Sequence, residues 1–305
     1  MRRIGAARRQ ARIVHACAGG ALALLVVLIA ACRADPPVVA TPPVWSVTRG
    51  ETTVYLFGSA HVLSPQTRWR SGALQAAFAD AERLVFEAVP GPQMIEEAQA
   101  LFDSNGRNPQ GITLTALLGP SEAERLWRVT ARLNMPMDGL QSMRPWLAAQ
   151  QIALASATAH GARADHGVET QLLAQAGGRV VEALETPAEQ ILTLATLSPE
   201  DEVRMLGATL RQAEEDPQSA LRAEQAWARG DLAAMEALGL QSLGEAGPTF
   251  YARVITTRNQ RFAAAAAGYL AGADDVLFVV GAAHMVGQDG VIALLRGQGL
   301  TVSGP

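Results

Sequence analysis

Two apolar, β-prone segments end in the same four-residue pattern, and this repetition restricts the folds open to the chain. Residues 53–57 precede Gly-Ser-Ala-His at 58–61, and residues 276–280 precede Gly-Ala-Ala-His at 281–284. A strand that ends in glycine, two small residues and histidine places an imidazole at the carboxyl edge of a sheet. The two histidines are 223 positions apart. The pattern therefore predicts that the two ends of the fold meet at one site.

The first 31 residues have the features of a secretory signal. Five arginines are followed by an uncharged run over residues 16–31. This run is shorter than the roughly 20 residues that a membrane span requires. Small residues directly before Cys32 resemble a bacterial lipobox, which predicts that Cys32 becomes the lipidated first residue. An ordinary cleaved signal and an uncleaved anchor are the alternatives. Arg33 favours the periplasmic face of the outer membrane over the inner membrane, and the Pro-rich residues 32–43 read as a tether.

Composition excludes several kinds of chemistry after residue 31. Cys17 lies within the signal, so the chain beyond Cys32 has no thiol for a nucleophile or a thiolate metal site. All 25 basic residues are arginine, which excludes Schiff-base lysines and Walker-type phosphate loops. Removal of the signal takes away five arginines and no acids, so the formal net charge changes from −4 to −9. An acidic domain of this kind is a poor candidate for binding nucleic acid.

Residues 44–305 predict one α/β domain. Strands alternate with helices at both ends of this region, which is typical of a central mixed, partly parallel β-sheet covered by helices. Helical patterns dominate the middle, so we predict a large helical insertion over about residues 92–270. The expected strands are 44–47, 52–57, 83–88, 179–184, 276–280 and 300–303, and the outer helices are 71–82 and 290–296.

Three residue patterns predict where individual helices begin. Ser121 with Glu124 three residues later has the spacing of a capping box. Pro145 suits the first position of another helix. Thr186 with Glu189 is a second capping box, before a helix that starts near Pro187.

Three of the expected strands end in residues suited to catalysis. These are His61, Glu87 and His284. Two imidazoles and a carboxylate with an open position suit a catalytic divalent metal ion, which lowers the pKa of bound water and polarises a carbonyl. Taken singly, each histidine also fits a hydrogen-bonded turn and Glu87 a solvated strand end. The matching contexts favour the metal.

Other polar residues have weaker claims to a role. Ser59 lies beside His61, but neighbours on a turn rarely point together and no Gly-x-Ser-x-Gly elbow exists, which argues against serine hydrolysis. We expect His160 and His166 to be surface residues. Arg258 and Asn259 lie on the long helix before the last parallel strand, where they could orient a substrate oxyanion or the carboxylate. A surface arginine and a helix amide is the alternative. Glu185 could face the cleft.

The order of these phrases resembles the TraB/GumN family, which is related to the Tiki metalloproteases. The resemblance covers about residues 44–303, nearly all of the expected domain. It implies that His61, Glu87 and His284 form one site, with Arg258 and Asn259 as supporting residues. It also implies a divalent-metal-dependent peptidase and leaves manganese, cobalt and zinc open. The matching phrases are residues 55–63, 84–87, 144–146, 167–169, 184–190, 258–259, 279–287, 290–295 and 299–302.

The chain departs from the family pattern at two positions. Glu169 stands where aspartate is expected in Gly-Val-Asp, and Ala283 where glycine is commoner in Gly-x-Gly-His. The first change is conservative, and the second adds a methyl group that narrows the turn. Neither removes an expected ligand.

The sequence therefore predicts an exported, lipid-anchored hydrolase that uses a divalent metal to cleave peptides or other small acyl substrates. Arg258 would stabilise the oxyanion. One alternative is a non-catalytic envelope protein that carries haem or a metal, and another is an accessory component of polysaccharide production. Haem pockets are rich in aromatic residues, and an aromatic content of 5% therefore favours hydrolysis.

Overall fold

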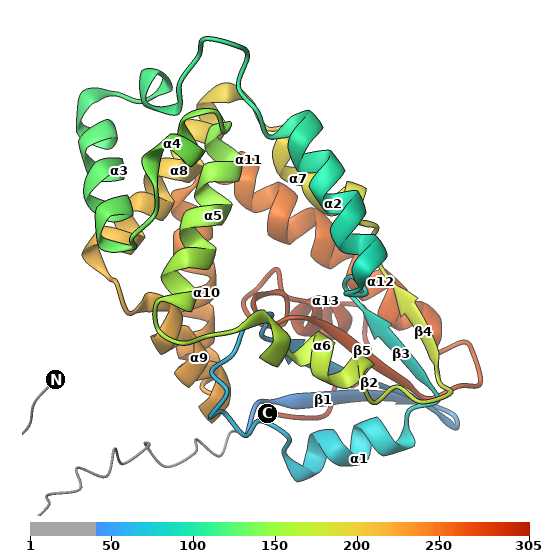
Figure 1. Cartoon of the computed structure of the whole chain (residues 1–305). Helices are drawn as coiled ribbons and strands as arrows, with labels where there is room; N and C mark the ends of the chain where they lie inside the picture. Colours follow the sequence, from blue (N-terminus) through green and yellow to red (C-terminus); the bar gives the residue numbers. More distant parts are fainter. Residues whose placement is uncertain (1–40) are drawn as a thin grey trace, which may run out of the picture. The chain divides into compact units, whose positions relative to one another are not determined.

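A five-stranded sheet forms the base of the fold in the computed structural model, which describes residues 41–305 (Figure 1). The strand order is β1-β2-β5-β3-β4. Only β1 runs antiparallel to its neighbour, while β2, β5, β3 and β4 are mutually parallel. This confirms the predicted mixed, partly parallel sheet. The strands are β1 (Val44–Arg49), β2 (Thr52–Ser59), β3 (Arg83–Phe86), β4 (Val180–Ala183) and β5 (Val276–Gly281).

Period-two alternation divides the side chains of the strands between two apolar cores. Leu277 and Val279 of β5 belong to the core that contains α1 (Gly72–Asp80) and α6 (Val168–Leu173). Phe278 and its alternate neighbours pack against α12 (Thr257–Tyr269) and α13 (Val291–Gly297). Because β5 is buried on both faces, it reads as an unbroken apolar run.

Most of the remaining helices gather beyond the end of the sheet where the parallel strands finish (Figure 1). These helices are α2 (Pro92–Asn105), α3 (Pro120–Arg132), α4 (Met137–Gln141), α5 (Pro145–Thr158), α7 (Pro187–Ala195), α8 (Pro199–Glu215), α9 (Ser219–Arg229), α10 (Leu232–Glu245) and α11 (Pro248–Tyr251). All of them except α9 contribute to a third apolar core that includes Trp146, Ile152 and Leu206, whereas Ala226, Trp227 and Ala228 of α9 belong to the core around α1 and α6. A π-helical stretch, Ala252–Thr256, joins α11 to α12.

The register of β2 against β5 brings the repeated motifs together. Gly58 pairs with Val280 and Ser59 with Gly281. Parallel strands place their carboxyl ends at one edge, so both Gly-x-x-His segments leave the sheet side by side. The predicted meeting of the two ends of the fold is thus a direct result of strand pairing.

Two local predictions are wrong, for identifiable reasons. Helix α3 begins at Pro120 with Gly119 as its N-cap and no side-chain cap, so Ser121 lies inside the helix and forms no capping box. Proline at the first helical position sets the boundary instead. The predicted last strand, 300–303, is reduced to an isolated bridge between Ser303 and Ser46. Pro145 at the start of α5 and the Thr186–Glu189 capping box are confirmed.

The predictions for the N-terminus concern residues that lie outside the described part. The signal at 1–31, the lipidation of Cys32 and most of the tether at 32–43 fall within residues 1–40. Within residues 41–305, every helix is too short or too polar to cross a lipid bilayer.

Candidate functional site

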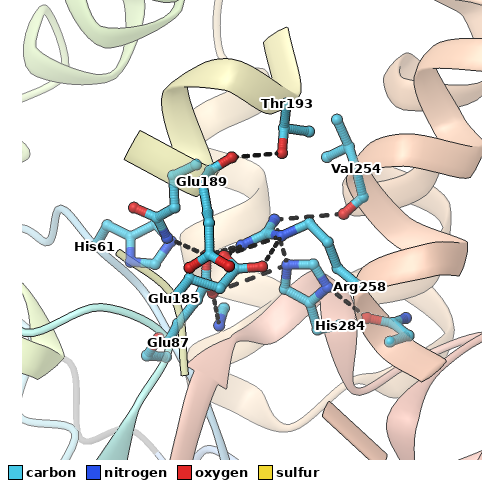
Figure 2. A network of polar contacts seen from close by, with 12 residues as sticks. His61, Glu87, Glu185, Glu189, Thr193, Val254, Arg258 and His284 are labelled. Atoms are coloured by element: carbon cyan, nitrogen blue, oxygen red, sulfur yellow. Dashed lines mark hydrogen bonds and ion pairs between the residues drawn. The ribbon is translucent and has the colours of Figure 1, made fainter. Parts of the chain in front are cut away.

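Each of the four parallel strands delivers a polar side chain to the same edge of the sheet. His61 follows β2, Glu87 follows β3, Glu185 follows β4, and His284 ends the short 3₁₀ turn η4 (Ala282–His284) after β5. Arg258 reaches the same place from the start of α12. Figure 2 shows His61 and His284 on either side of the cluster that these carboxylates form with Arg258. The open edge of a parallel sheet is the usual ligand site in such folds.

The three residues predicted as ligands converge above Gly281. A Cβ atom on Gly281 would lie 3.3 Å from His61 Nε2, 3.4 Å from Glu87 Oε2 and 3.5 Å from His284 Cδ2. His284 Nε2 is 3.8 Å from Glu87 Oε2. Glycine at 281 therefore leaves a small space that all three side chains face.

A buried glutamate orients His61. The Nδ1 atom of His61 lies 2.7 Å from Glu169 Oε1, whereas the His61 ring is 62% exposed to solvent. The same Glu169 oxygen accepts a 2.5 Å hydrogen bond from Ser59 Oγ. With Nδ1 turned to the carboxylate, Nε2 is the ring atom left to face the site. The expectation that neighbours on this turn point apart is wrong, because both Ser59 and His61 reach Glu169.

This geometry does not make Ser59 a nucleophile. Its hydroxyl donates to Glu169 and is buried, with 3% of its surface exposed. A serine nucleophile needs a base that accepts its proton and a path to the substrate. The carboxylate instead lies between serine and histidine, so Ser59 helps to hold Glu169 in place.

An amide fixes the tautomer of His284. Its Nδ1 is 2.5 Å from Asn259 Oδ1, and Asn259 Nδ2 donates to the carbonyl of Asp289 at 2.7 Å. Because Asn259 Oδ1 can only accept, the proton of the neutral imidazole must lie on Nδ1. The lone pair on Nε2 then faces Arg258 Nη1 at 3.2 Å.

Arg258 is the centre of a buried ionic network, and each of its five N–H groups has a partner. Nε donates to Glu185, and Nη2 donates to Glu185 at 2.6 Å and to Glu87 Oε1 at 2.5 Å. Nη1 faces His284 and the carbonyl of Val254. Arg261 approaches the other side of Glu185 from the surface. Arg258 thus holds Glu87 and Glu185 in fixed positions.

Glu87 is held at both carboxylate oxygens. Oε1 accepts from Arg258 and from Gln190 Nε2 at 3.1 Å, and Oε2 accepts from the Gly281 amide at 2.9 Å. Burial by itself would raise the pKa of Glu87. The positive charges of His284, which is protonated at the low pH where Glu87 titrates, and of His61 and Arg258 outweigh burial and hold the pKa at about 2. Glu87 is therefore ionised at neutral pH.

The two histidines have opposite electrostatic surroundings. The charge of Glu169 raises the pKa of His61 to about 9, against the effect of desolvation. Burial lowers the pKa of His284 to about 4, against the attraction of Glu87. The same His61 charge outweighs burial at Glu169 and lowers the pKa of that carboxyl. The site therefore combines a neutral imidazole, a charged one and a fixed carboxylate.

The side chains suit a divalent metal ion in kind, with binding requiring the charged His61 to release its Nε2 proton, because only a neutral imidazole has a free lone pair. Each imidazole has its Nδ1 turned to an outer oxygen, of Glu169 or of Asn259, which is the usual support of a metal-binding histidine. The distances are less favourable. Across residues 41–305 no group of three or more His, Cys, Asp or Glu side chains is arranged so that it could hold a metal. Arg258 also occupies the Nε2 lone pair of His284.

The sequence identified the strand-end residues but not how they are supported. Glu169 was noted only as a departure from a family phrase, and Glu185 only as a residue that could face the cleft. Gln190 was not singled out. Their phrases, Gly167-Val168-Glu169 and residues 184–190, carried the available signal. His160 is exposed and His166 half-buried, as expected for residues away from the polar cluster.

Comparison with known proteins identifies one family. The model described as the TraB/PrgY/gumN family matches residues 43–304. No curated protein and no solved structure matches the chain.

Proposed function

The chain belongs to the TraB/PrgY/gumN family, and from this premise we propose that it is a divalent-metal-dependent hydrolase that cleaves peptide bonds. The observation that carries the proposal is the convergence of His61 Nε2, Glu87 Oε2 and His284 above Gly281. Each of these side chains is held by a second polar group. Such preorganised polar groups in a cleft are typical of catalytic sites.

The proposed reaction is the addition of water to a peptide carbonyl. The carbon–nitrogen bond then breaks, the amine takes up a proton, and the products are a carboxylate and an amine. His61 Nε2, His284 Nε2 and Glu87 Oε2 are the atoms that would hold the metal. A bound divalent ion would supply an activated water and polarise the carbonyl.

The residues of the chain have distinct roles in this proposal. Glu87 suits a ligand better than a general base, because a carboxyl with a pKa of about 2 is a weak proton acceptor near neutrality. Arg258 contributes a fixed positive charge and positions Glu87, since its five N–H groups are already engaged. In this proposal Arg258 therefore does not donate a hydrogen bond directly to the oxyanion, which was its role in the sequence-based expectation. Glu169 and Asn259 keep the two imidazoles in the required orientation.

Removing metal tests the proposal directly. We expect the purified chain to contain a divalent ion and to cleave members of a broad peptide library, and dialysis against a chelator to abolish cleavage. Restoring manganese, cobalt or zinc should restore it. Metal content is measured by elemental analysis and cleavage by mass spectrometry. Cleavage that is undiminished in chelated, metal-free protein would contradict the metal requirement, and a protein that cleaves nothing would contradict the hydrolase.

A methyl group at position 281 should block the site without disturbing the fold. In Gly281→Ala the new Cβ would occupy the space faced by His61, Glu87 and His284, at ordinary to tight contact distances. We expect divalent-ion uptake and cleavage to be lost, while the protein stays folded and its free energy of unfolding falls by about 1–3 kcal/mol. The control is Gly268→Ala on α12, where a Cβ meets nothing within 4 Å. Full ion uptake by Gly281→Ala would show that the ion binds elsewhere.

One observation favours a second function, a non-catalytic binding protein. Arg258 already pairs with Glu87 and with the Nε2 lone pair of His284, so the polar cluster is internally satisfied. A carrier of haem or a metal would show stoichiometric binding without turnover in the same assays. An accessory protein of polysaccharide production would show neither.

The location of the protein is also a proposal. The arginine-rich start, the uncharged run and Cys32 support export and lipid anchoring at the outer membrane. Labelling of the wild type and of Cys32→Ser with a lipid precursor would test this, because only the wild type should incorporate the label.

A further inference from the structure

Two cavities border the candidate site, one on each side. The first has a volume of about 470 Å³ and extends towards α7, and the second has about 460 Å³ and extends towards α10. We name them the α7 cavity and the α10 cavity. Both volumes fall in the roughly 300–1,000 Å³ range of ligand pockets. In Figure 1, α2 and α7 lie on the opposite side of the helical part from α9 and α10. The residues that line both cavities are His61, Glu87, Leu243, Val254 and Arg258.

The α7 cavity offers hydrogen-bonding groups. Gln150 of α5 and Gln190 and Thr193 of α7 line it, together with the apolar Met94 and Phe250. Thr193 lies beside the polar cluster (Figure 2). The Gln150 amide has no hydrogen-bond partner in the described part of the chain, so both its donor and its acceptor are available to a ligand. Gln190 Nε2 already donates to Glu87, and the Thr193 hydroxyl donates to the carbonyl of Glu189, so these two residues offer acceptor oxygens to a peptide N–H group. Gln150 can both donate to a peptide carbonyl and accept from a peptide N–H.

The α10 cavity is walled mainly by small apolar residues. Trp227 forms one wall, and its indole nitrogen donates to the carbonyl of Gly58 at 2.7 Å, which fixes the ring. Ala283, the residue that departs from the family pattern, faces Gly239 of α10, where a Cβ would lie 3.5 Å from the Ala283 methyl. Other lining residues are Ala157, Ala162, Ala220, Leu221, Ala223 and Met235. This cavity suits an apolar side chain.

The cavities have few charges that could bind a peptide terminus. The acidic and arginine residues that line the cavities at the site are Glu87 and Arg258, which pair with each other, and Glu169, which pairs with His61. Glu224 is the one further acidic or arginine residue among the described lining residues of either cavity. Its carboxylate already accepts from the Ser64 amide and from Thr67 Oγ1. Recognition of an α-amino or α-carboxylate group needs a charged partner, because burying an unpaired charge is costly.

We propose that the substrate is an internal segment of a polypeptide, bound in extended form across both cavities. The cleaved bond then lies at their junction, beside His61 and Glu87, which line both cavities. An apolar side chain occupies the α10 cavity, and the backbone on the other side bonds to the amides and hydroxyl of the α7 cavity. This inference rests on the proposed hydrolase and specifies its substrate class.

Filling the α10 cavity provides the first test. Gly239→Leu places a larger side chain against Ala283, and leucine favours the helix more than glycine does. The matched control is Gly244→Leu on the same helix, where the position is exposed and a Cβ meets nothing within 4 Å. Any loss confined to Gly239→Leu therefore comes from the cavity and not from the helix.

Filling the α7 cavity provides the second test. Thr193→Phe projects an aromatic ring into that cavity. The matched control is Leu192→Phe, one residue earlier on α7, because Leu192 is exposed to solvent and lines neither cavity. Thermal melting of all four variants identifies any that fail to fold.

The probe is a library of octapeptides with acetylated N-termini and amidated C-termini. We measure the bonds that the full chain cuts and, independently, the peptides that the immobilised chain retains, both by mass spectrometry. We expect internal cleavage, with an apolar residue enriched at one fixed position from the cut. Gly239→Leu and Thr193→Phe should each lower cleavage and retention by about 10-fold or more. Their controls should stay within about twofold of the wild type.

The two readouts separate failure of the inference from failure of the hydrolase. If no peptide is cut but retention depends on both cavities, the proposed hydrolase is wrong, and binding of the peptide across both cavities (the spanning mode) is supported. Release of terminal residues alone, or a dependence on only one cavity, would overturn the spanning mode while leaving the hydrolase intact. If the wild type neither retains nor cleaves any peptide, both the inference and the hydrolase are wrong.

Discussion

Replacing Arg258 with methionine is expected to lower the free energy of unfolding of the metal-free protein by about 3–5 kcal/mol. Arg258 is 8% exposed, and its guanidinium pairs with Glu87 and Glu185, which are 6% and 3% exposed. Methionine keeps much of the side-chain volume but leaves two carboxylates without their main counter-charge. Equilibrium denaturation with urea, followed by circular dichroism, measures the loss.

Arg261 provides the matched control, because it pairs with the same Glu185 from a half-exposed position. Arg261→Met should cost no more than about 1 kcal/mol, since water screens exposed ion pairs. Adding Glu185→Gln to Arg258→Met should recover part of the stability by removing one unpaired charge. Equal losses from Arg258→Met and Arg261→Met would show that the buried network does not stabilise the fold.

The second large effect is on catalysis. His61→Ala and His284→Ala are each expected to lower kcat/KM for peptide cleavage by about 10²–10⁴-fold, and to lower metal content with it. His61 is the cleaner variant, because its ring is 62% exposed and its removal should leave the fold intact. His284 is 5% exposed, so its variant also requires a melting measurement.

His166 is the control for these substitutions. It is half-buried and lines neither the α7 cavity nor the α10 cavity. His166→Ala should keep metal content and most of the activity. If all three histidine variants match the wild type in metal content and turnover, the proposed centre is wrong.

The strands that build the site were predictable because their signals are local. β5 is an unbroken apolar run, and β2 and β5 both lead into a Gly-x-x-His motif, so the sequence located both strands. The closing strand at 300–303 was not predictable in this way. Among its residues, Ser303 alone forms a backbone bridge with β1, at Ser46. The chain end is also held by the Trp45 indole, which donates to the carbonyl of Pro305. The sequence pattern indicates that residues 300–303 favour an extended backbone. It does not indicate whether the edge strand β1 pairs with them along their whole length.

The candidate site divides in the same manner. His61, Glu87 and His284 could be found because each directly follows its own strand. The role of Glu169 could not, because it lies 108 residues from His61 in sequence and reaches it only through the packing of α6. Glu185 and Arg258 are separated by 73 residues and meet only because α12 packs beside the sheet edge.

The sequence alone determined that the polar side chains lie at strand ends and that those ends share one edge, because strand periodicity and parallel pairing are encoded locally. Tertiary packing decided which charge pairs with which, and it placed Arg258 between the two carboxylates and His284. It also decided that a cavity opens on each side of the site. The pairing of charged side chains and the shape of the cavities depend on distances between elements that are far apart in the sequence. These distances cannot be read from the spacing of residues along the chain.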